Sequence, residues 1–217
     1  MSEVPSVLFL FLGWLLGVLS PIIVDGIRRR REIAEVKPAI GAELRALQAK
    51  LAATTYHIAK RFGAPNRPLL EWVKSVFDAY DGPNADKEQS KAIGALLAYP
   101  DAELTVLMQR DEDAERRALS LRSLNTPYLD SQLGHLAMLG HATQSLLAEI
   151  KVQVGFLNEQ IAESRFYWQK TLDPGVSPEN HQIIKDNLRD VCLQVAKRAP
   201  HLGELIERYV KDMGSSA

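Results

Sequence analysis

The five histidines are the side chains of this sequence best suited to hold a metal, so their spacing decides whether a metal site can be expected. A di-iron site in a helical bundle needs a Glu-x-x-His pair on each of two helices. No histidine follows a glutamate at that spacing, because the third preceding positions hold Thr54, Gln132, Met138, Pro178 and Arg198. His135 and His141 lie six positions apart, which on one helix is a net rotation of about 240°. We therefore predict no metal site.

Other motifs for catalysis or cofactor binding are absent from the sequence. It contains no phosphate-binding G-x-x-x-x-G-K-[ST], no dinucleotide-binding G-x-G-x-x-G, no H-E-x-x-H and no G-x-S-x-G. Asp111 and Asp113 are spaced as in a D-x-D, but two positions apart on a helix they point in different directions. Tyr167 and Trp168 beside Arg165 would suit a ligand shelf, although aromatic residues at helical spacing usually belong to a core. We predict no catalytic residue and no cofactor.

Composition limits the choice of partners. The chain has 26 basic and 27 acidic residues, a net charge of −1. Residues 1–31 hold four basic and two acidic side chains, which leaves 22 basic and 25 acidic residues, or −3, for the rest. A weakly acidic domain argues against nucleic acid as a partner, because that binding relies on neutralising phosphates. Cys192 is the only cysteine, so an intramolecular disulfide is excluded and a buried, inert thiol is predicted.

The elements that position these residues begin with an uncharged stretch of 21 residues. Residues 4–24 read VPSVLFLFLGWLLGVLSPIIV. As a helix they would reach about 31 Å, the thickness of the hydrocarbon core of a bilayer. The preceding residues, MSE, include no basic side chain, and this disfavours a cleaved signal peptide. We predict a transmembrane helix over 4–24.

The flanking charges predict how this helix is oriented. Arg28, Arg29, Arg30 and Arg31 follow it, whereas no lysine or arginine precedes it. By the positive-inside rule, residues 1–3 form a short extracytoplasmic tail, 25–31 a basic juxtamembrane segment and 32–213 a cytoplasmic domain, with 214–217 as a frayed tail. The four arginines serve as the topology signal and are also placed to contact lipid headgroups.

Small residues within the predicted span form a candidate surface for pairing with a second helix. Gly13 and Gly17 make a G-x-x-x-G, and Ser20 continues it by one turn. Small residues at this spacing let two membrane helices approach closely. Glycine is also common in membrane helices, so the pattern remains open to both interpretations.

The domain that follows is expected to be all-α, an antiparallel helical bundle. Apolar residues recur in steps of three and four, and no segment alternates in the manner of a strand. Helices are predicted over 33–62 with a kink or fresh start at Pro38, from Pro68 to Tyr80, around 93–97, over 101–117, from Thr126 to Asp173 with a break near Gly140, and from Ser177 with a restart at Pro200. Opposite charges four apart, Glu112 with Arg116 and Asp113 with Arg117, indicate a solvated face.

These patterns favour a single-pass membrane protein whose helical domain binds a protein partner or a second copy at the cytoplasmic membrane face. The lipid bilayer itself is the first expected partner. Two alternatives stay open. One is an enzyme whose site is assembled from scattered helix residues. The other is an effector that oligomerises through Gly13 and Gly17 and perturbs the membrane.

Overall fold

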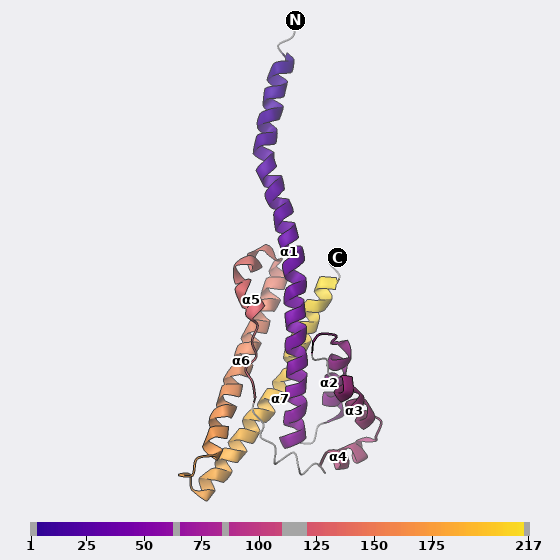
Figure 1. Cartoon of the computed structure of the whole chain (residues 1–217), viewed down its shortest axis with the longest axis vertical. Helices are drawn as coiled ribbons and strands as arrows, with labels where there is room; N and C mark the ends of the chain where they lie inside the picture. The colour runs from indigo at the N-terminus through magenta and orange to yellow at the C-terminus, as the bar shows by residue number, and fades with distance from the viewer. Residues whose placement is uncertain (1–3, 63–65, 84–86, 110–120, 215–217) are drawn as a thin grey trace.

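The computed structural model describes residues 4–62, 66–83, 87–109 and 121–214 (Figure 1). Within these ranges the chain is all-α and contains no strand, as the apolar periodicity predicts. The helices are α1 (Val4–Phe62), α2 (Arg67–Ala79), α3 (Lys87–Leu97), α4 (Asp101–Gln109), α5 (Pro127–Ser131), the 3-10 helix η2 (Leu133–Met138), α6 (His141–Thr171) and α7 (Pro178–Gly214).

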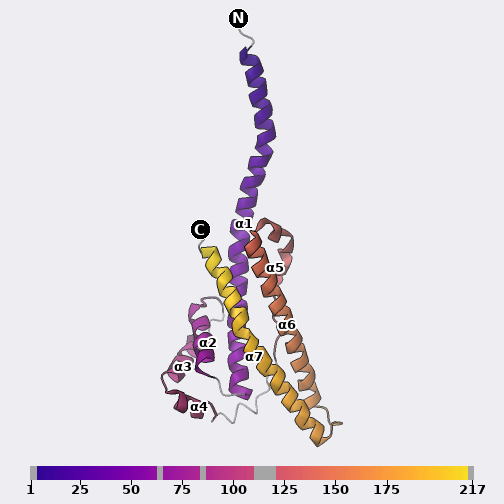
Figure 2. The ribbon, with the colours of Figure 1, turned by 180° about the vertical axis from the view of Figure 1, so that it is seen from behind.

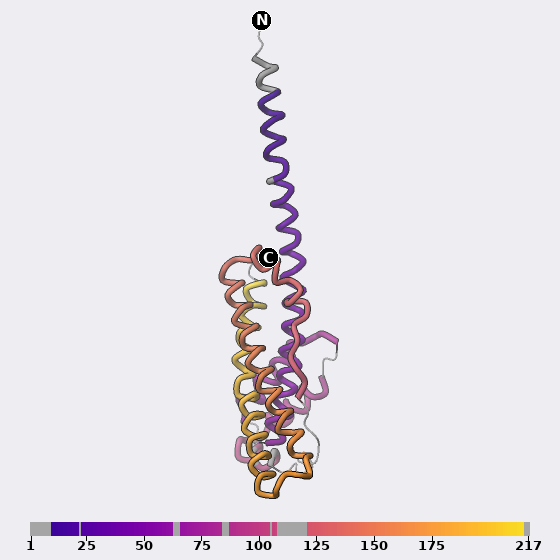
Figure 3. Tube along the Cα trace, turned by 90° about the vertical axis from the view of Figure 1, so that its left-hand side faces the viewer, coloured from indigo at the N-terminus to yellow at the C-terminus, as the bar shows by residue number. Residues whose placement is uncertain are grey.

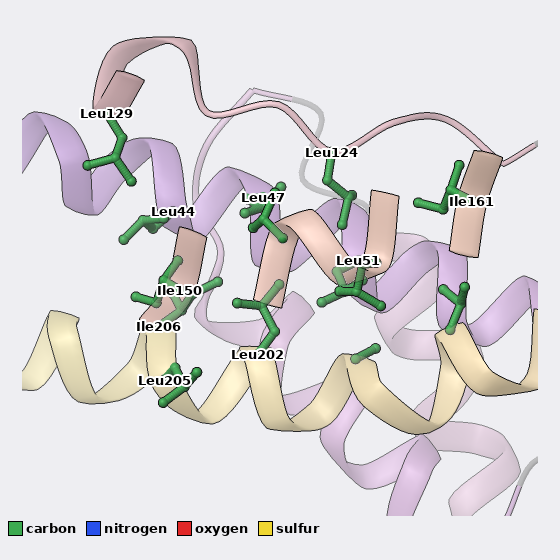
Figure 4. Close-up of a cluster of buried hydrophobic side chains, with 14 of the residues drawn as sticks. Leu44, Leu47, Leu51, Leu124, Leu129, Ile150, Ile161, Leu202, Leu205 and Ile206 are labelled. Carbon is green, nitrogen blue, oxygen red and sulfur yellow. The ribbon is translucent and has the colours of Figure 1, made fainter. Parts of the chain in front are cut away.

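The main core lies between three long helices. α6 and α7 form an antiparallel hairpin, and α7 also packs against the second half of α1, so that α7 runs antiparallel to both neighbours (Figures 1 and 2). Leucine and isoleucine side chains from all three helices meet along this line (Figure 4). The fully buried members include Leu44 and Leu51 of α1, Ile150 of α6, and Leu202 and Ile206 of α7.

A second, smaller core lies on another side of α1. α2 packs on α1 and α3 packs on α2, around Leu70, Val73 and Ile93, which are fully buried. Asn66 caps α2 by accepting a hydrogen bond from the Leu69 amide at 3.0 Å. Arg67 joins this layer together, because it donates to the carbonyls of Leu97 and Tyr99 and to the Asp101 carboxylate. Trp72 touches both cores.

Three prolines lie inside helices without ending them. α1 continues through Pro21 and Pro38, and α7 continues through Pro200. The predicted restart at Pro200 is therefore wrong, and so is a fresh start at Pro38, whereas the alternative of a kink at Pro38 stays a prediction. A proline in a helix interior costs about 3 kcal/mol. Burial of each large apolar side chain contributes about 1.5–3 kcal/mol, and the turns after Pro200 bury Leu202, Leu205 and Ile206. Tertiary packing outweighs the local defect.

The predicted helix from Thr126 to Asp173 is divided into α5, η2 and α6. Gly140 has φ −59° and ψ 150°, an extended conformation that separates η2 from α6 at the expected place. Thr126 occupies the cap position of α5, but its side chain makes no capping hydrogen bond. Instead, the Glu43 carboxylate of α1 accepts from the amides of Tyr128 and Leu129 at 2.8 and 2.9 Å. The cap comes from another helix, which local sequence could not indicate.

Some predictions fall outside the described residues. The pairs Glu112–Arg116 and Asp113–Arg117, with Asp111, lie within 110–120. The tails 1–3 and 215–217 lie outside as well. These expectations stay predictions.

Candidate membrane-contact segment

The first half of α1 extends beyond the bundle with no other described helix beside it (Figure 3). All side chains described between Leu10 and Arg31 are exposed. They include eleven large apolar residues: Leu10, Phe11, Leu12, Trp14, Leu15, Leu16, Val18, Leu19, Ile23, Val24 and Ile27. Burying a large apolar side chain contributes about 1.5–3 kcal/mol of favourable free energy. Leaving these side chains in water therefore loses on the order of 10 kcal/mol or more of stabilisation. Among the described helices, α1 holds the single stretch long and apolar enough to cross a membrane.

The arginine cluster, Arg28–Arg31, follows this stretch on the same unbroken helix. Successive residues of an α-helix are rotated by about 100°, so four consecutive arginines surround the helix within about 4.5 Å of its length. Arg28 donates from Nε to the Glu32 carboxylate at 2.9 Å, and all four side chains are exposed. A ring of positive charge next to an apolar helix suits anionic headgroups on every side of the helix.

Gly13, Gly17 and Ser20 lie on one side of the apolar stretch. Their positions fall within about 60° around the helix axis. A methyl group added at Gly13 or Gly17 would meet nothing within 4 Å, so this small-residue face is open. The geometry allows close approach of a second helix.

The junction with the bundle is rigidly packed. Burial begins with Ile33 and Val36, which lie against the main core. The Tyr209 hydroxyl of α7 donates to the Lys37 carbonyl at 3.2 Å, and burial raises the pKa of Tyr209 to about 12. A methyl group at Gly41 would come within 2.2 Å of the Met213 side chain, so α7 crosses α1 closely here. The exposed stretch of α1 is therefore joined without a helix break to a segment packed on α7.

The clefts lined by described residues include three on the bundle. One of about 220 Å³ lies between α1, α2 and α7, where the Gln48 amide donates to the Gly203 carbonyl and the Glu207 carboxylate, both at 3.3 Å. A second, of about 430 Å³, is bordered largely by alanines of α1 and by Phe77 and Tyr80. The third, of about 320 Å³, lies where the end of α1 meets α6 and α7, and it is the most basic of the three.

The side chains singled out for chemistry do not form one site. His135 lies on η2 and His141 begins α6, so the two histidines are not on one continuous helix. The His181 ring is instead held by backbone carbonyls of Thr171 and Val176. Among the described residues, no group of three or more His, Cys, Asp and Glu side chains is arranged to hold a metal ion.

The aromatic shelf does not assemble as the sequence suggests. Arg165 turns away to donate to the Leu121 carbonyl at 2.8 Å, and the Tyr167 ring packs edge-on against Phe166. Trp168 lies beside a different arginine, Arg61, whose guanidinium carbon is 5.9 Å from the indole centroid. Arg61 and Trp168 are 107 positions apart in the chain, so spacing alone gave no signal of this pair.

Cys192 is buried in the main core, as predicted for a structural thiol. Burial raises the pKa of this thiol to about 11, against the opposing influence of the Arg61 charge. A thiol that stays protonated at neutral pH is a poor nucleophile.

Comparison with known proteins identified no relative: no family model, no curated protein and no solved structure matches this chain.

Proposed function

We propose that this chain is a single-pass membrane protein whose helical domain acts at the cytoplasmic face as a non-enzymatic interaction, scaffold or sensor module. The observation that carries this proposal is the continuity of α1 from the exposed apolar stretch, through the arginine cluster, into the buried core. A helix placed in lipid would hold the domain next to the membrane without an intervening linker. The arginine cluster would keep that domain on the cytoplasmic side.

A surface of α6 supports a protein partner. The α6 stripe consists of Val152, Phe156, Glu159, Glu163 and Phe166, which lie within about 80° around the helix. Its three apolar members are exposed by 54, 44 and 53% respectively. Exposed aromatic side chains of this kind commonly mark protein contacts. The two carboxylates between them favour a partner with an apolar face and basic neighbours.

Membrane insertion and orientation can be tested with single cysteines. In a Cys192→Ala background, Ser2→Cys and Glu204→Cys each introduce one thiol, on opposite sides of the predicted span. A membrane-impermeant maleimide applied to intact cells should label the first and spare the second. Labelling of Glu204→Cys, or recovery of the full chain from a detergent-free soluble fraction, would refute the anchored orientation.

The interaction role can be tested by photo-crosslinking in isolated membranes. A photoreactive phenylalanine replaces Phe156 or Phe166 on the α6 stripe, and Gln194 of α7 serves as the exposed control position. We expect one discrete adduct, with another protein or a second copy, from the α6 positions alone. Absence of a reproducible adduct under every growth condition would count against a scaffold role.

The small-residue face favours a second proposal, self-association within the membrane. Gly13, Gly17 and Ser20 are open to a second helix, as described above. Dimers can be trapped in membranes with an amine-reactive crosslinker, which does not depend on disulfides. Gly17→Leu should abolish the crosslinked dimer. Val18→Leu changes the next residue, which lies on a different side of the helix, and should leave the dimer yield unchanged. Equal dimer yields from both variants would exclude pairing through this face.

A further inference from the structure

The most basic cleft of the bundle, here called the basic pocket, is built from three helices. Its lining consists of Arg61, Phe62, Trp168, Thr171, Lys185, Asp186, Leu188 and Arg189. Its volume of about 320 Å³ lies at the lower end of the range typical of small-molecule sites, roughly 300–1,000 Å³. No single segment of the sequence contains this group, which forms only when the end of α1 meets the α6–α7 hairpin.

The pocket carries an excess of positive charge. Three of its side chains are cationic and one, Asp186, is acidic, so the lining has a formal charge of +2. Asp186 is already engaged by Gln182, which donates to it at 3.0 Å. Lys185 and Arg189 are exposed and form no ion pair or hydrogen bond with any residue that the structure describes. Their charges are therefore available to a ligand.

The floor of the pocket is apolar and aromatic. Leu188 is buried, and Phe62 and Trp168 are partly buried against the main core. The Arg61 guanidinium carbon lies 5.2 Å from the Phe62 ring centroid and 5.9 Å from that of Trp168. Contact with both rings restrains this cation, which lowers the conformational cost of presenting it to an anion. A planar guanidinium suits the oxygens of a phosphate group.

We propose that the basic pocket binds a small phosphate ester that carries an aromatic ring, of the nucleoside monophosphate class. A phosphate ester carries a charge of about −1.5 to −2 at pH 7, which is opposite in sign to the exposed side chains of Lys185 and Arg189. Lys185 and Arg189 contact the phosphate, and the ring of the ligand lies against the apolar floor beside Arg61, Phe62 and Trp168. Binding itself does not require the membrane role proposed above, whereas the exclusion of lipid phosphates as ligands rests on it.

The position of the pocket separates it from lipid phosphates. Its lining residues come from the end of α1 and from the parts of α6 and α7 near the turn between them, and these segments lie at the end of the bundle opposite the apolar half of α1 (Figures 1 and 2). Thirty helical residues separate Arg31 from Arg61, a distance of about 45 Å along α1. This far exceeds the roughly 8–10 Å over which exposed charges act in physiological salt. In the anchored orientation the ligand is therefore soluble.

The test uses the full chain in an uncharged detergent and isothermal titration calorimetry. The probes are adenosine 5′-monophosphate, glycerol 3-phosphate as a mimic of a lipid headgroup, inorganic phosphate and adenosine. The pocket variant is Lys185→Ala with Arg189→Ala. The matched control is Lys197→Ala with Arg208→Ala, which removes the same charges from exposed positions elsewhere on α7. Trp168→Leu tests the aromatic floor.

We expect saturable binding of adenosine 5′-monophosphate, weaker binding of the two ring-free phosphates and none of adenosine. The pocket variant should raise the Kd for adenosine 5′-monophosphate by about tenfold or more, equivalent to 1.4 kcal/mol, and the control variant should not change it. Trp168→Leu should remove the preference for the nucleotide over glycerol 3-phosphate. Equal affinity of those two ligands for the unmodified chain, equal weakening by both double variants, or no saturable nucleotide binding would each overturn the proposal.

Discussion

The two halves of α1 have the same backbone and opposite surroundings. Leu16 in the first half is 62% exposed, whereas Leu44 in the second half is fully buried. Both belong to one helix of 59 residues. The second half obtains its apolar contacts from α2 and α7, and the first half has none among the described residues. Since the helix is shared, the difference lies in which apolar faces the rest of the chain supplies. The first half depends on a surface from outside, and we propose that lipid provides it.

The largest expected contrast comes from truncating the same side chain in each half. Leu44→Ala should lower the free energy of unfolding of the bundle by about 2–5 kcal/mol, because it leaves a cavity in the main core. Leu16→Ala should change it by less than about 0.5 kcal/mol, because no bundle residue touches that side chain. Urea unfolding in detergent, followed by circular dichroism, measures both. A comparable loss from Leu16→Ala would mean that the first half packs on the bundle.

Glycines sharpen the same comparison. A Cβ at Gly203 of α7 would lie 3.0 Å from two ring atoms of the buried side of Trp72, so Gly203→Val should destabilise the bundle by about 1–3 kcal/mol. Gly17→Val meets no atom within 4 Å and should leave bundle stability unchanged. The same unfolding measurement applies. Stability of Gly203→Val equal to that of the unmodified chain would show that the Trp72 ring can shift without cost.

Sequence periodicity is sufficient to predict the buried side of a helix where the apolar face runs along the helix without interruption. In the helix predicted over 33–62, the apolar residues spaced three and four apart include Ile40, Leu44 and Leu51, which are fully buried, because helical spacing alone determines which side is apolar. It failed where a distant element decides the local structure. Packing of the residues that follow Pro200 overrides the expected restart, and the cap of α5 comes from Glu43 of α1 rather than from the adjacent Thr126. No local signal in the sequence indicates either.

The candidate sites divide in the same way. The apolar stretch and the arginine cluster are contiguous, so the sequence alone identifies them. The basic pocket is different, because Arg61 and Lys185 are 124 positions apart and meet only after α1 and α7 have packed. The sequence indicates Trp168 as a candidate ligand-binding residue but suggests Arg165, its neighbour in the chain, as its partner instead of Arg61. A single sequence does not specify which of several arginines an aromatic ring will face.

Alkaline pH should destabilise the bundle through two buried groups of α7, Tyr209 and Cys192, and leave the exposed half of α1 unaffected. Burial raises the pKa of Tyr209 from 10.0 to about 12 and that of Cys192 from 9.0 to about 11. Above each unfolded value the unfolded chain loses a proton that the folded chain retains, so stability is present at lower pH and falls as pH rises. The expected slope approaches about 1.4 kcal/mol per pH unit for each group between about pH 9 and 12.

Two variants separate the contributions of the two groups to this loss of stability at alkaline pH. Cys192→Ala should remove the part that begins near pH 9, and Tyr209→Phe the part that begins near pH 10, as measured by urea unfolding at stepped pH. Tyr209→Phe also removes the hydrogen bond to the Lys37 carbonyl, which should lower stability at pH 7 by about 0.5–1.5 kcal/mol. A pH profile that is flat to pH 12 would indicate that neither group is as buried in solution.

The smallest expected effect on folding belongs to the boundary between the two halves. Arg28 and Glu32 form an exposed ion pair of the i,i+4 type, with the Arg28 side chain 76% exposed, so Arg28→Gln should alter bundle stability by no more than about 0.5 kcal/mol. Replacing all four arginines by glutamine should be equally mild for unfolding, because each side chain is exposed.

Orientation should respond differently, because the quadruple variant loses the charge difference across the proposed span. A fraction of molecules should then expose Glu204→Cys to an external maleimide, whereas Arg28→Gln alone, with three arginines left, should not. If the quadruple variant stays uniformly oriented, the arginine cluster is not the topology signal. If it unfolds the bundle instead, the cluster belongs to the buried half of α1 rather than to its boundary.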